Sequence, residues 1–260
     1  MFSDLVPKLI GEISSSVHDV DILPDGKIIV AAGDSVCVYN KYGLEVTHKV
    51  TDMCKPLNKY HFLYGVGAHK TRDVIAVTDL ISKINTTNED CTIGYLHVYN
   101  NGCYNKYDVC GQPLSVVITN NCEYIITNRM DNYIYKYGSN GMFMWRKNIF
   151  ERPESLFIDH QDMTVVCSAG DVLILRQNGQ KVLSLKDKNP NINAVSAVIT
   201  GPKRHILISD IKTNSVSVYR ENGDFVKHLI RMNYRPGKIA VYEDNYLVVF
   251  SNRLLVYKLK

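Results

Sequence analysis

An all-β fold, a six-bladed β-propeller of four-stranded antiparallel blades, is predicted by three observations on this sequence of 260 residues. A strand-like stretch followed by a turn that ends in glycine recurs five times, and the copies close at Gly43, Gly102, Gly141, Gly179 and Gly223. After the first interval the spacing is about 40 residues, which suits one four-stranded blade. Short apolar runs separated by turn residues fill each copy, whereas no long segment has helical periodicity.

The fifth copy shows the expected blade most clearly. We predict its four strands at 194–199, 205–209, 215–219 and 224–230, with turn residues between them. Asn222 and Gly223 tolerate the positive φ angles that a tight hairpin turn requires. The six copies begin near Val17, Tyr60, Pro113, Pro153, Ala194 and Pro236.

The sixth copy is incomplete, because the sequence ends at Lys260 after three expected strands. Such a blade would leave an unpaired edge. Segment 5–13 resembles an outermost strand such as 225–230, so we predict that it completes the sixth blade. We interpret 1–260 as a single domain. An insertion at about 80–92 in the second copy is polar and long, which predicts a mobile loop or, alternatively, a specificity loop.

Composition limits the possible functions. The formal net charge of +4 allows an acidic partner without requiring one, and we expect no binding to DNA. The 7 cysteines lack CxxC spacing, so we predict no structural metal and no cofactor. No apolar run approaches the roughly 20 residues of a membrane span, and residues 1–11 lack a signal-peptide core. We therefore expect a cytoplasmic protein without a membrane partner.

The segment Ile208-Ser-Asp-Ile-Lys-Thr-Asn-Ser-Val-Ser-Val-Tyr-Arg-Glu-Asn-Gly-Asp-Phe225 resembles an NHL repeat, and residues 126–137 are a weaker copy. The resemblance covers nearly the whole chain, although Ala32-Gly-Asp34 and Ser168-Ala-Gly-Asp171 depart from the pattern. Among NHL proteins, the chain resembles in character the C-terminal propellers of tripartite-motif ubiquitin ligases. This resemblance implies a recognition module for protein or RNA, with ubiquitin transfer by a RING elsewhere. The sequence contains no RING, B-box or coiled-coil residues.

Binding residues are expected where the connections between blades meet the turns between second and third strands. Acidic residues outnumber basic ones over this face, which weakens a general nucleic-acid interpretation. Around the fifth and sixth copies the basic residues are opposed only by Asp187 and Asp210. Such a surface suits an acidic peptide or single-stranded RNA, or is simply a solvated rim. The candidate residues are Arg129, Lys188, Lys212, Arg231, Tyr234, Arg235, Lys238 and Arg253.

A catalytic role has less support in the sequence. A metal-dependent lactonase-like hydrolase needs carboxylates from several innermost strands, and only Asp19 and Asp21 lie on such strands. His18 beside Asp19 suggests a dyad, but no nucleophile motif accompanies it. We predict a non-catalytic interaction scaffold that recognises a protein partner, as in substrate recognition for a ubiquitin ligase. Single-stranded RNA binding is the alternative, and the lactonase-like hydrolase is a remote one.

Overall fold

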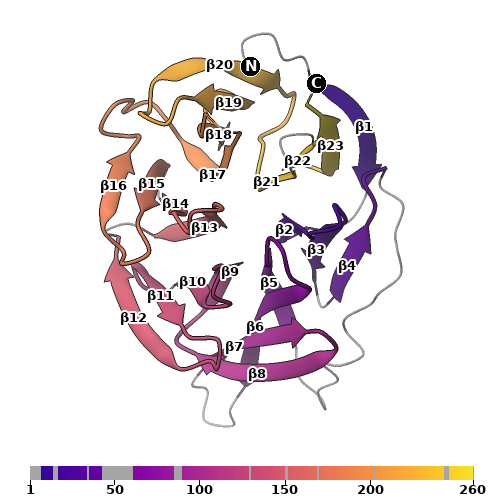
Figure 1. The fold of residues 1–260 in the computed structure, drawn as a ribbon, viewed down its shortest axis with the longest axis vertical. Coiled ribbons are helices and arrows are strands. Elements are labelled where there is room, and N and C mark those ends of the chain that lie inside the picture. The colour runs from indigo at the N-terminus through magenta and orange to yellow at the C-terminus, as the bar shows by residue number, and fades with distance from the viewer. Residues whose placement is uncertain are drawn as a thin grey trace. The chain divides into compact units, whose positions relative to one another are not determined.

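The computed structural model describes residues 7–13, 17–33, 35–42, 61–84, 90–128, 130–149, 152–168, 170–201, 203–242 and 246–259. Strands are the only regular elements of these residues, and they form six antiparallel sheets, the blades of a β-propeller (Figure 1). The predicted fold class is confirmed. None of the described residues belongs to a helix long and apolar enough to cross a membrane.

The chain divides into two compact units. The blade 1–3 unit comprises Ser16–Asn40 and Leu44–Arg152, and the blade 4–6 unit comprises Met1–Ser15, Lys41–Gly43 and Pro153–Lys260. Within each unit, neighbouring blades pack against each other through shared clusters of buried apolar residues.

The blade 1–3 unit contains three sheets of consecutive strands. Blade 1 has β2 (Asp19–Ile22), β3 (Ile28–Ala32) and β4 (Ser35–Tyr39), and residues 43–60, which follow β4 closely, lie outside the described residues. Blade 2 has β5 (His61–Ala68), β6 (Val74–Ile84), β7 (Asp90–Asn100) and β8 (Cys103–Val109). Blade 3 has β9 (Pro113–Ile118), β10 (Tyr124–Asn128), β11 (Tyr133–Tyr137) and β12 (Phe143–Asn148).

The blade 4–6 unit repeats the same meander. Blade 4 has β13 (Pro153–Ile158), β14 (Thr164–Ser168), β15 (Asp171–Leu175) and β16 (Lys181–Ser184). Blade 5 has β17 (Ala194–Thr200), β18 (His205–Asp210), β19 (Ser215–Tyr219) and β20 (Phe225–Arg231). Blade 6 has β21 (Ile239–Tyr242), β22 (Tyr246–Phe250) and β23 (Leu254–Lys258).

The N-terminal strand completes blade 6, as the sequence predicts. Strand β1 (Lys8–Ile13) pairs antiparallel with β23, from Lys8 opposite Lys258 to Ile13 opposite Leu254 (Figure 1). The open edge of β23 is thereby covered, and both ends of the chain are held in one sheet.

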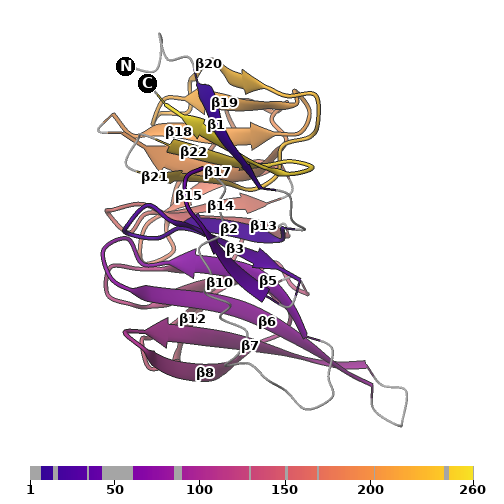
Figure 2. The same ribbon diagram turned by 90° about the vertical axis from the view of Figure 1, so that its right-hand side faces the viewer.

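We expected a loop at 80–92, whereas the structure shows a long β-hairpin over most of this segment. Strands β6 and β7 continue through most of this segment and remain paired from Leu80 opposite Gly94 to Ile84 opposite Asp90. Figure 2 shows the two strands running side by side into the hairpin. The physical reason is that both arms of the segment carry β-branched residues, Ile81 and Ile84 on one strand and Thr92 and Ile93 on the other, which favour extended structure over a loop. Residues 85–89 lie outside the described residues.

Burial falls from the inner to the outer strands of a blade. All five residues of β10 are buried, whereas β12 at the edge of the same sheet is mostly exposed. Second strands are apolar on both faces because a neighbouring blade covers each face. In the blade 4–6 unit, for example, Ile206 and Ile208 pack towards blade 4, and Leu207 packs towards blade 6. Rigid sheets of this kind hold the turns at their ends in fixed positions.

Candidate binding surface

One end of blade 5 carries Lys212 and Arg231, two of the basic residues that the sequence singled out. Asp210 pairs with Ser215 and Ser215 pairs with Arg231, so these strand ends lie side by side. The N–H of Met232 donates to the carbonyl oxygen of Asn214 at 2.8 Å. The β18–β19 turn, with Lys212, and the start of the β20–β21 connection therefore lie at the same end of the sheet.

Arg231, Tyr234 and Arg235 are exposed in this region, and 58% of the Tyr234 surface is accessible. Arg231 ends β20, and the other two lie in the connection to β21. Among the described residues, no hydrogen bond or ion pair involves any of these three side chains. Two guanidinium groups and one aromatic ring are therefore open to a ligand.

The acidic residues expected to oppose this surface are engaged elsewhere. Asp210 is only 4% exposed, and its Oδ1 accepts a hydrogen bond from the N–H of Lys212 at 2.8 Å. This contact closes the β18–β19 turn. Asp187 is exposed, and its carboxylate lies 3.6 Å from the ammonium of Lys181. Neither carboxylate is paired with Arg231 or Arg235 among the residues described.

Two lysines of the predicted set are tethered. The Nζ of Lys212 donates to Oδ1 of Asn191 at 3.1 Å, which joins the β18–β19 turn to the connection from blade 4. The Nζ of Lys238 donates to the backbone carbonyl of Glu154 on β13 at 3.0 Å. Both ammonium groups therefore stabilise contacts between segments as well as contributing positive charge.

Arg253, in the β22–β23 turn, forms an ion pair with Glu12 on β1. The side chains remain 47% and 38% exposed, so solvent weakens this pair. Sequence reasoning missed Glu12 as a partner, although the prediction that segment 5–13 pairs with the last strand placed the two residues near each other.

The structure does not bring Lys188 together with Arg231. Leu185 and Lys188 lie against the β19–β20 turn, where a Cβ added to Gly223 would be 2.9 Å from Leu185 and 3.1 Å from the Lys188 Cδ atom. Tyr219 pairs with Phe225 beside this turn, at the opposite end of the strands from Arg231. The cause is burial of Leu185, which draws the segment over the face of blade 5. Arg129 lies outside the described residues.

The positive charge of Arg231 affects the pKa of His228, which lies on the same strand, β20. The Nδ1 atom of His228 lies 2.9 Å from the Ser217 hydroxyl and 3.0 Å from the Ser215 hydroxyl. Burial lowers the pKa of His228, the positive charge of Arg231 lowers it further, and Asp210 acts in the opposite direction. The neutral form of the ring is therefore favoured, and in that form Nδ1 can accept a hydrogen bond from a serine hydroxyl.

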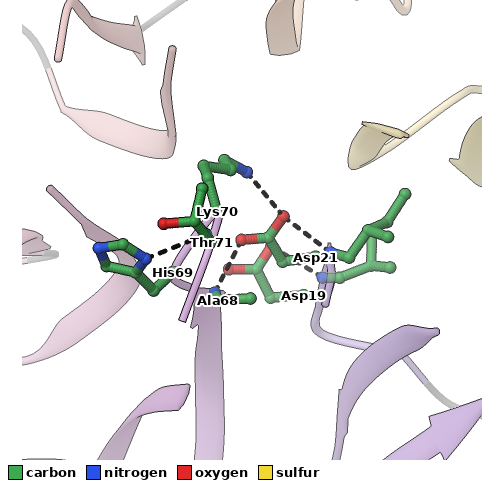
Figure 3. Close-up of polar contacts among 8 residues, drawn as sticks. Asp19, Asp21, Ala68, His69, Lys70 and Thr71 are labelled. Carbon is green, nitrogen blue, oxygen red and sulfur yellow. Dashed lines mark hydrogen bonds and ion pairs between the residues drawn. The ribbon is translucent and has the colours of Figure 1, made fainter. Parts of the chain in front are cut away.

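The two acids of the innermost strands belong to the blade 1–3 unit, where they join neighbouring blades (Figure 3). Asp21 Oδ2 accepts a hydrogen bond from the N–H of Ala68 at 2.9 Å, and its Oδ1 lies 3.4 Å from the Lys70 ammonium. Asp19 Oδ2 accepts from the Ser115 hydroxyl at 3.2 Å. These carboxylates connect three innermost strands. In the part of the chain that is described, no cluster of three or more His, Cys, Asp or Glu residues could hold a metal ion.

Comparisons with known proteins define the fold but not a family. No family model matches the sequence, and a comparison with curated proteins finds no match. A streptogramin B lyase structure aligns with a TM-score of 0.64 at 10% identity, covering 98% of this chain and 97% of that one. The WD40 propeller of Doa1 aligns with a TM-score of 0.60 at 13% identity and 97% coverage of both chains.

The β-propeller of Cps50 (Swd1) from Myceliophteria thermophila gives a TM-score of 0.65 at 9% identity, covering 98% of this chain and 100% of that one. Identities this low establish a shared propeller fold alone. Because the aligned propellers include both a lyase and a WD40 domain, the shared fold does not define a function.

Proposed function

We propose that this chain is a non-catalytic interaction scaffold that recognises an acidic segment of a protein partner through Arg231, Tyr234 and Arg235. The observation that carries the proposal is the exposure of these three side chains, at the end of β20 and in the connection that follows it, without an ion pair among the described residues. In its more specific form, the proposal is that the chain selects substrates for a ubiquitin ligase. Ubiquitin transfer would then be performed by a module outside these 260 residues.

The chemistry of the three side chains suits a carboxylate-bearing ligand. A guanidinium group can donate two parallel hydrogen bonds to one carboxylate, which gives both affinity and orientation. Arginine and tyrosine are also enriched among the residues that dominate protein interfaces. A basic surface attracts an acidic partner during encounter, and this attraction weakens as salt screens it.

A peptide-binding experiment tests the proposal. The probe is a fluorescein-labelled peptide of sequence Glu-Asp-Phe-Glu-Asp-Leu-Glu-Asp, and its control has Gln and Asn in place of Glu and Asp. We expect fluorescence anisotropy to show binding of the acidic peptide and at least a tenfold loss of affinity in the double variant Arg231→Ala, Arg235→Ala. Equal binding of both peptides, or no loss in the variant, would contradict the proposal.

A matched control separates this surface from general positive charge. Lys203 and Arg220 are exposed in the turns at the other end of blade 5. The double variant Lys203→Ala, Arg220→Ala removes the same formal charge and should bind the acidic peptide with nearly unchanged affinity. A loss equal to that of the Arg231 and Arg235 variant would show that net charge, not the proposed surface, governs binding.

Single-stranded RNA is a second candidate ligand, and the exposed ring of Tyr234 between two arginines is the observation that favours it. Such a ring can stack on an unpaired base while guanidinium groups neutralise phosphates. A 12-nucleotide oligouridylate is a suitable probe. Its affinity should fall log-linearly with salt, and Tyr234→Ala should weaken it more than Tyr234→Phe does. Equal effects of the two substitutions would count against stacking.

The lyase likeness raises an enzymatic alternative. A catalytically inactive virginiamycin B lyase from Staphylococcus aureus with quinupristin also aligns, with a TM-score of 0.62 at 10% identity. In this chain, Asp19 and Asp21 accept hydrogen bonds from neighbouring strands, which supports a structural role. Incubation with quinupristin tests the point. Turnover above a heat-denatured control would overturn the non-catalytic proposal.

The ubiquitin-ligase form needs a cellular readout. If the chain selects substrates, a partner protein that can be cross-linked to position 234 of this chain is a candidate substrate. In cells where Arg231 and Arg235 of this chain are both replaced by alanine, that partner should carry fewer ubiquitin conjugates and have a longer half-life. If the double variant no longer binds the partner but the half-life of the partner is unchanged, the chain would be an interaction scaffold without a role in ubiquitin ligation.

A further inference from the structure

The outermost strand of blade 3 exposes an unusual run of apolar side chains. Met142, Phe143 and Met144 are 67%, 54% and 49% exposed. Phe143 and Met144 begin β12, and Met142 immediately precedes it. Strand β12 is the edge strand of its sheet (Figure 1). A contiguous exposed apolar group marks an interaction surface more often than isolated apolar residues do. Methionine side chains also adapt to differently shaped partners.

The other described outermost strands do not share this feature. Strand β1 exposes one large apolar side chain, Leu9, while β16 exposes Val182 and β20 exposes Phe225. Strand β8 exposes none. The run at Met142–Met144 is therefore a property of blade 3 and is not required by the repeated architecture.

The sheet beneath holds this run in place. The Phe143 ring packs against Tyr135 and Tyr137, with centroids 6.4 Å and 6.1 Å away. Lys136 pairs with Trp145 and Tyr137 pairs with Phe143, so Met144 is the extra residue of a β-bulge. From Trp145 to Asn148 the register with β11 is regular. The exposed apolar residues 142–144 are thus followed by a regular strand, residues 145–148. The backbone N–H and C=O groups on the outer edge of this strand can pair with another strand.

Charge identifies the kind of partner. Arg146 and Lys147 follow the apolar run, and both are exposed. The guanidinium of Arg146 also lies 4.8 Å from the Tyr133 ring centre, which fixes its position. Strand β12 contains no acidic residue. Antiparallel pairing of β12 with a second copy would bring four positive charges together without a counter-charge, so a second copy is disfavoured.

We infer that β12 binds an extended segment of a partner protein by antiparallel β-strand addition. The acidic residues of that segment lie opposite Lys147 and Arg146, and the apolar residues that follow contact Met144, Phe143 and Met142. Main-chain hydrogen bonds supply the pairing, while the side chains select the sequence. This surface is separate from the one formed by Arg231 and Arg235, and the inference does not depend on the function proposed above.

The only tryptophan of the chain, Trp145, lies on β12 and reports binding without a label. The probe is the capped peptide acetyl-Glu-Glu-Thr-Val-Ile-Val-amide, and its charge-reversed control begins with two lysines. We expect a saturable change in Trp145 emission with the acidic peptide and an affinity about tenfold lower for the control at low salt. The difference should narrow as salt rises.

Backbone pairing is tested with methylated peptides. In a strand, only alternate N–H groups face a given neighbour. Two versions of the acidic peptide carry N-methyl groups on one or the other alternate set of residues. One version should lose binding at least tenfold and the other should keep most of it. Equal behaviour of the two versions would overturn strand addition.

Two substitutions test whether the change in Trp145 emission arises from binding at β12. Phe143→Ser should abolish the emission change, whereas Phe225→Ser, which alters a similarly exposed phenylalanine on β20, should leave it intact. The double variant Arg231→Ala, Arg235→Ala should also respond normally, which separates this surface from the one in the proposed function. No emission change with the acidic peptide at millimolar concentration would overturn the inference. Concentration-dependent dimerisation that is lost in Phe143→Ser would overturn it in favour of a second copy.

Discussion

The guanidinium of Arg204 lies 2.6 Å from the carboxylate of Asp159, which joins the first turn of blade 5 to the first turn of blade 4. The same side chain pairs with Glu221 at 2.6 Å and donates to Gln161 at 2.9 Å. Because Asp159 is only 1% exposed, Arg204→Ala should leave a buried carboxylate without its counter-charge. We expect a loss of about 3 kcal/mol in the free energy of unfolding, measured with urea.

Arg253→Ala is the control for that measurement, since Arg253 is paired with Glu12 at an exposed site. Its cost should be about 0.5 kcal/mol. Similar losses in the two variants would mean that burial of Asp159 has no special importance for stability.

Asp19 links strands of three blades in the blade 1–3 unit. Its Oδ2 lies 3.4 Å from the Val66 nitrogen and 3.2 Å from the Ser115 hydroxyl. Asp19→Ala removes the acceptor for buried donors and should destabilise this unit by about 2 kcal/mol. Thermal unfolding followed by circular dichroism provides the measurement. Asp25→Ala, at an exposed turn, should change the midpoint little; a larger effect there than at Asp19 would refute the structural role.

His228 makes stability depend on pH in a defined direction. Burial and the charge of Arg231 hold its pKa below the ordinary histidine value of 6.5, so the unfolded chain takes up the proton first as the pH falls. The free energy of unfolding therefore decreases as the pH falls from 6.5 towards the pKa of His228 in the folded protein. Between pH 7.5 and 5.5, the wild-type protein should lose more unfolding free energy than His228→Asn does. Identical pH profiles would contradict the assignment.

The same histidine reports on the candidate surface. Arg231→Ala removes one of the two causes that lower the pKa of His228, so that pKa should rise. NMR titration of the His228 ring measures the change directly. Arg220→Ala is the control, and a rise of equal size in that variant would mean that Arg231 has no special influence on His228.

Thiol reactivity should differ sharply among the cysteines. Burial raises the pKa of Cys167 to about 12, and its side chain is only 1% exposed. Cys103 and Cys110 are exposed. Iodoacetamide at pH 8 should therefore modify Cys103 and Cys110 in the native protein and Cys167 only after unfolding, as read by mass spectrometry. Rapid native modification of Cys167 would show that blade 4 opens readily.

The architecture was predictable because the repeat encodes it locally. Each copy has its own strands and turn residues, and Asn222-Gly223 alone indicates a hairpin. The pairing of β1 with β23 followed from an incomplete last copy. The expectation of a loop at 80–92 rested on the polar residues of this segment, although the β-branched residues Ile81, Ile84, Thr92 and Ile93 favour the longer hairpin that forms.

The candidate surface was only partly predictable. Sequence position places Arg231 and Arg235 after an outer strand, but it does not show that Asp210 turns inward to the Lys212 N–H. Nor does it show that burial of Leu185 carries Lys188 to the other end of blade 5. These outcomes depend on contacts between blades, which local pattern does not encode.

Photo-crosslinking from the exposed position of Tyr234 tests the central claim most directly. A benzophenone amino acid replaces Tyr234 in the intact chain, and a second protein carries it in place of Lys203 at the opposite end of blade 5. We predict a protein adduct from position 234 that is absent from position 203 and disappears when Arg231 and Arg235 are both alanine. An adduct with RNA instead of protein, or identical adducts from the two positions, would contradict this account.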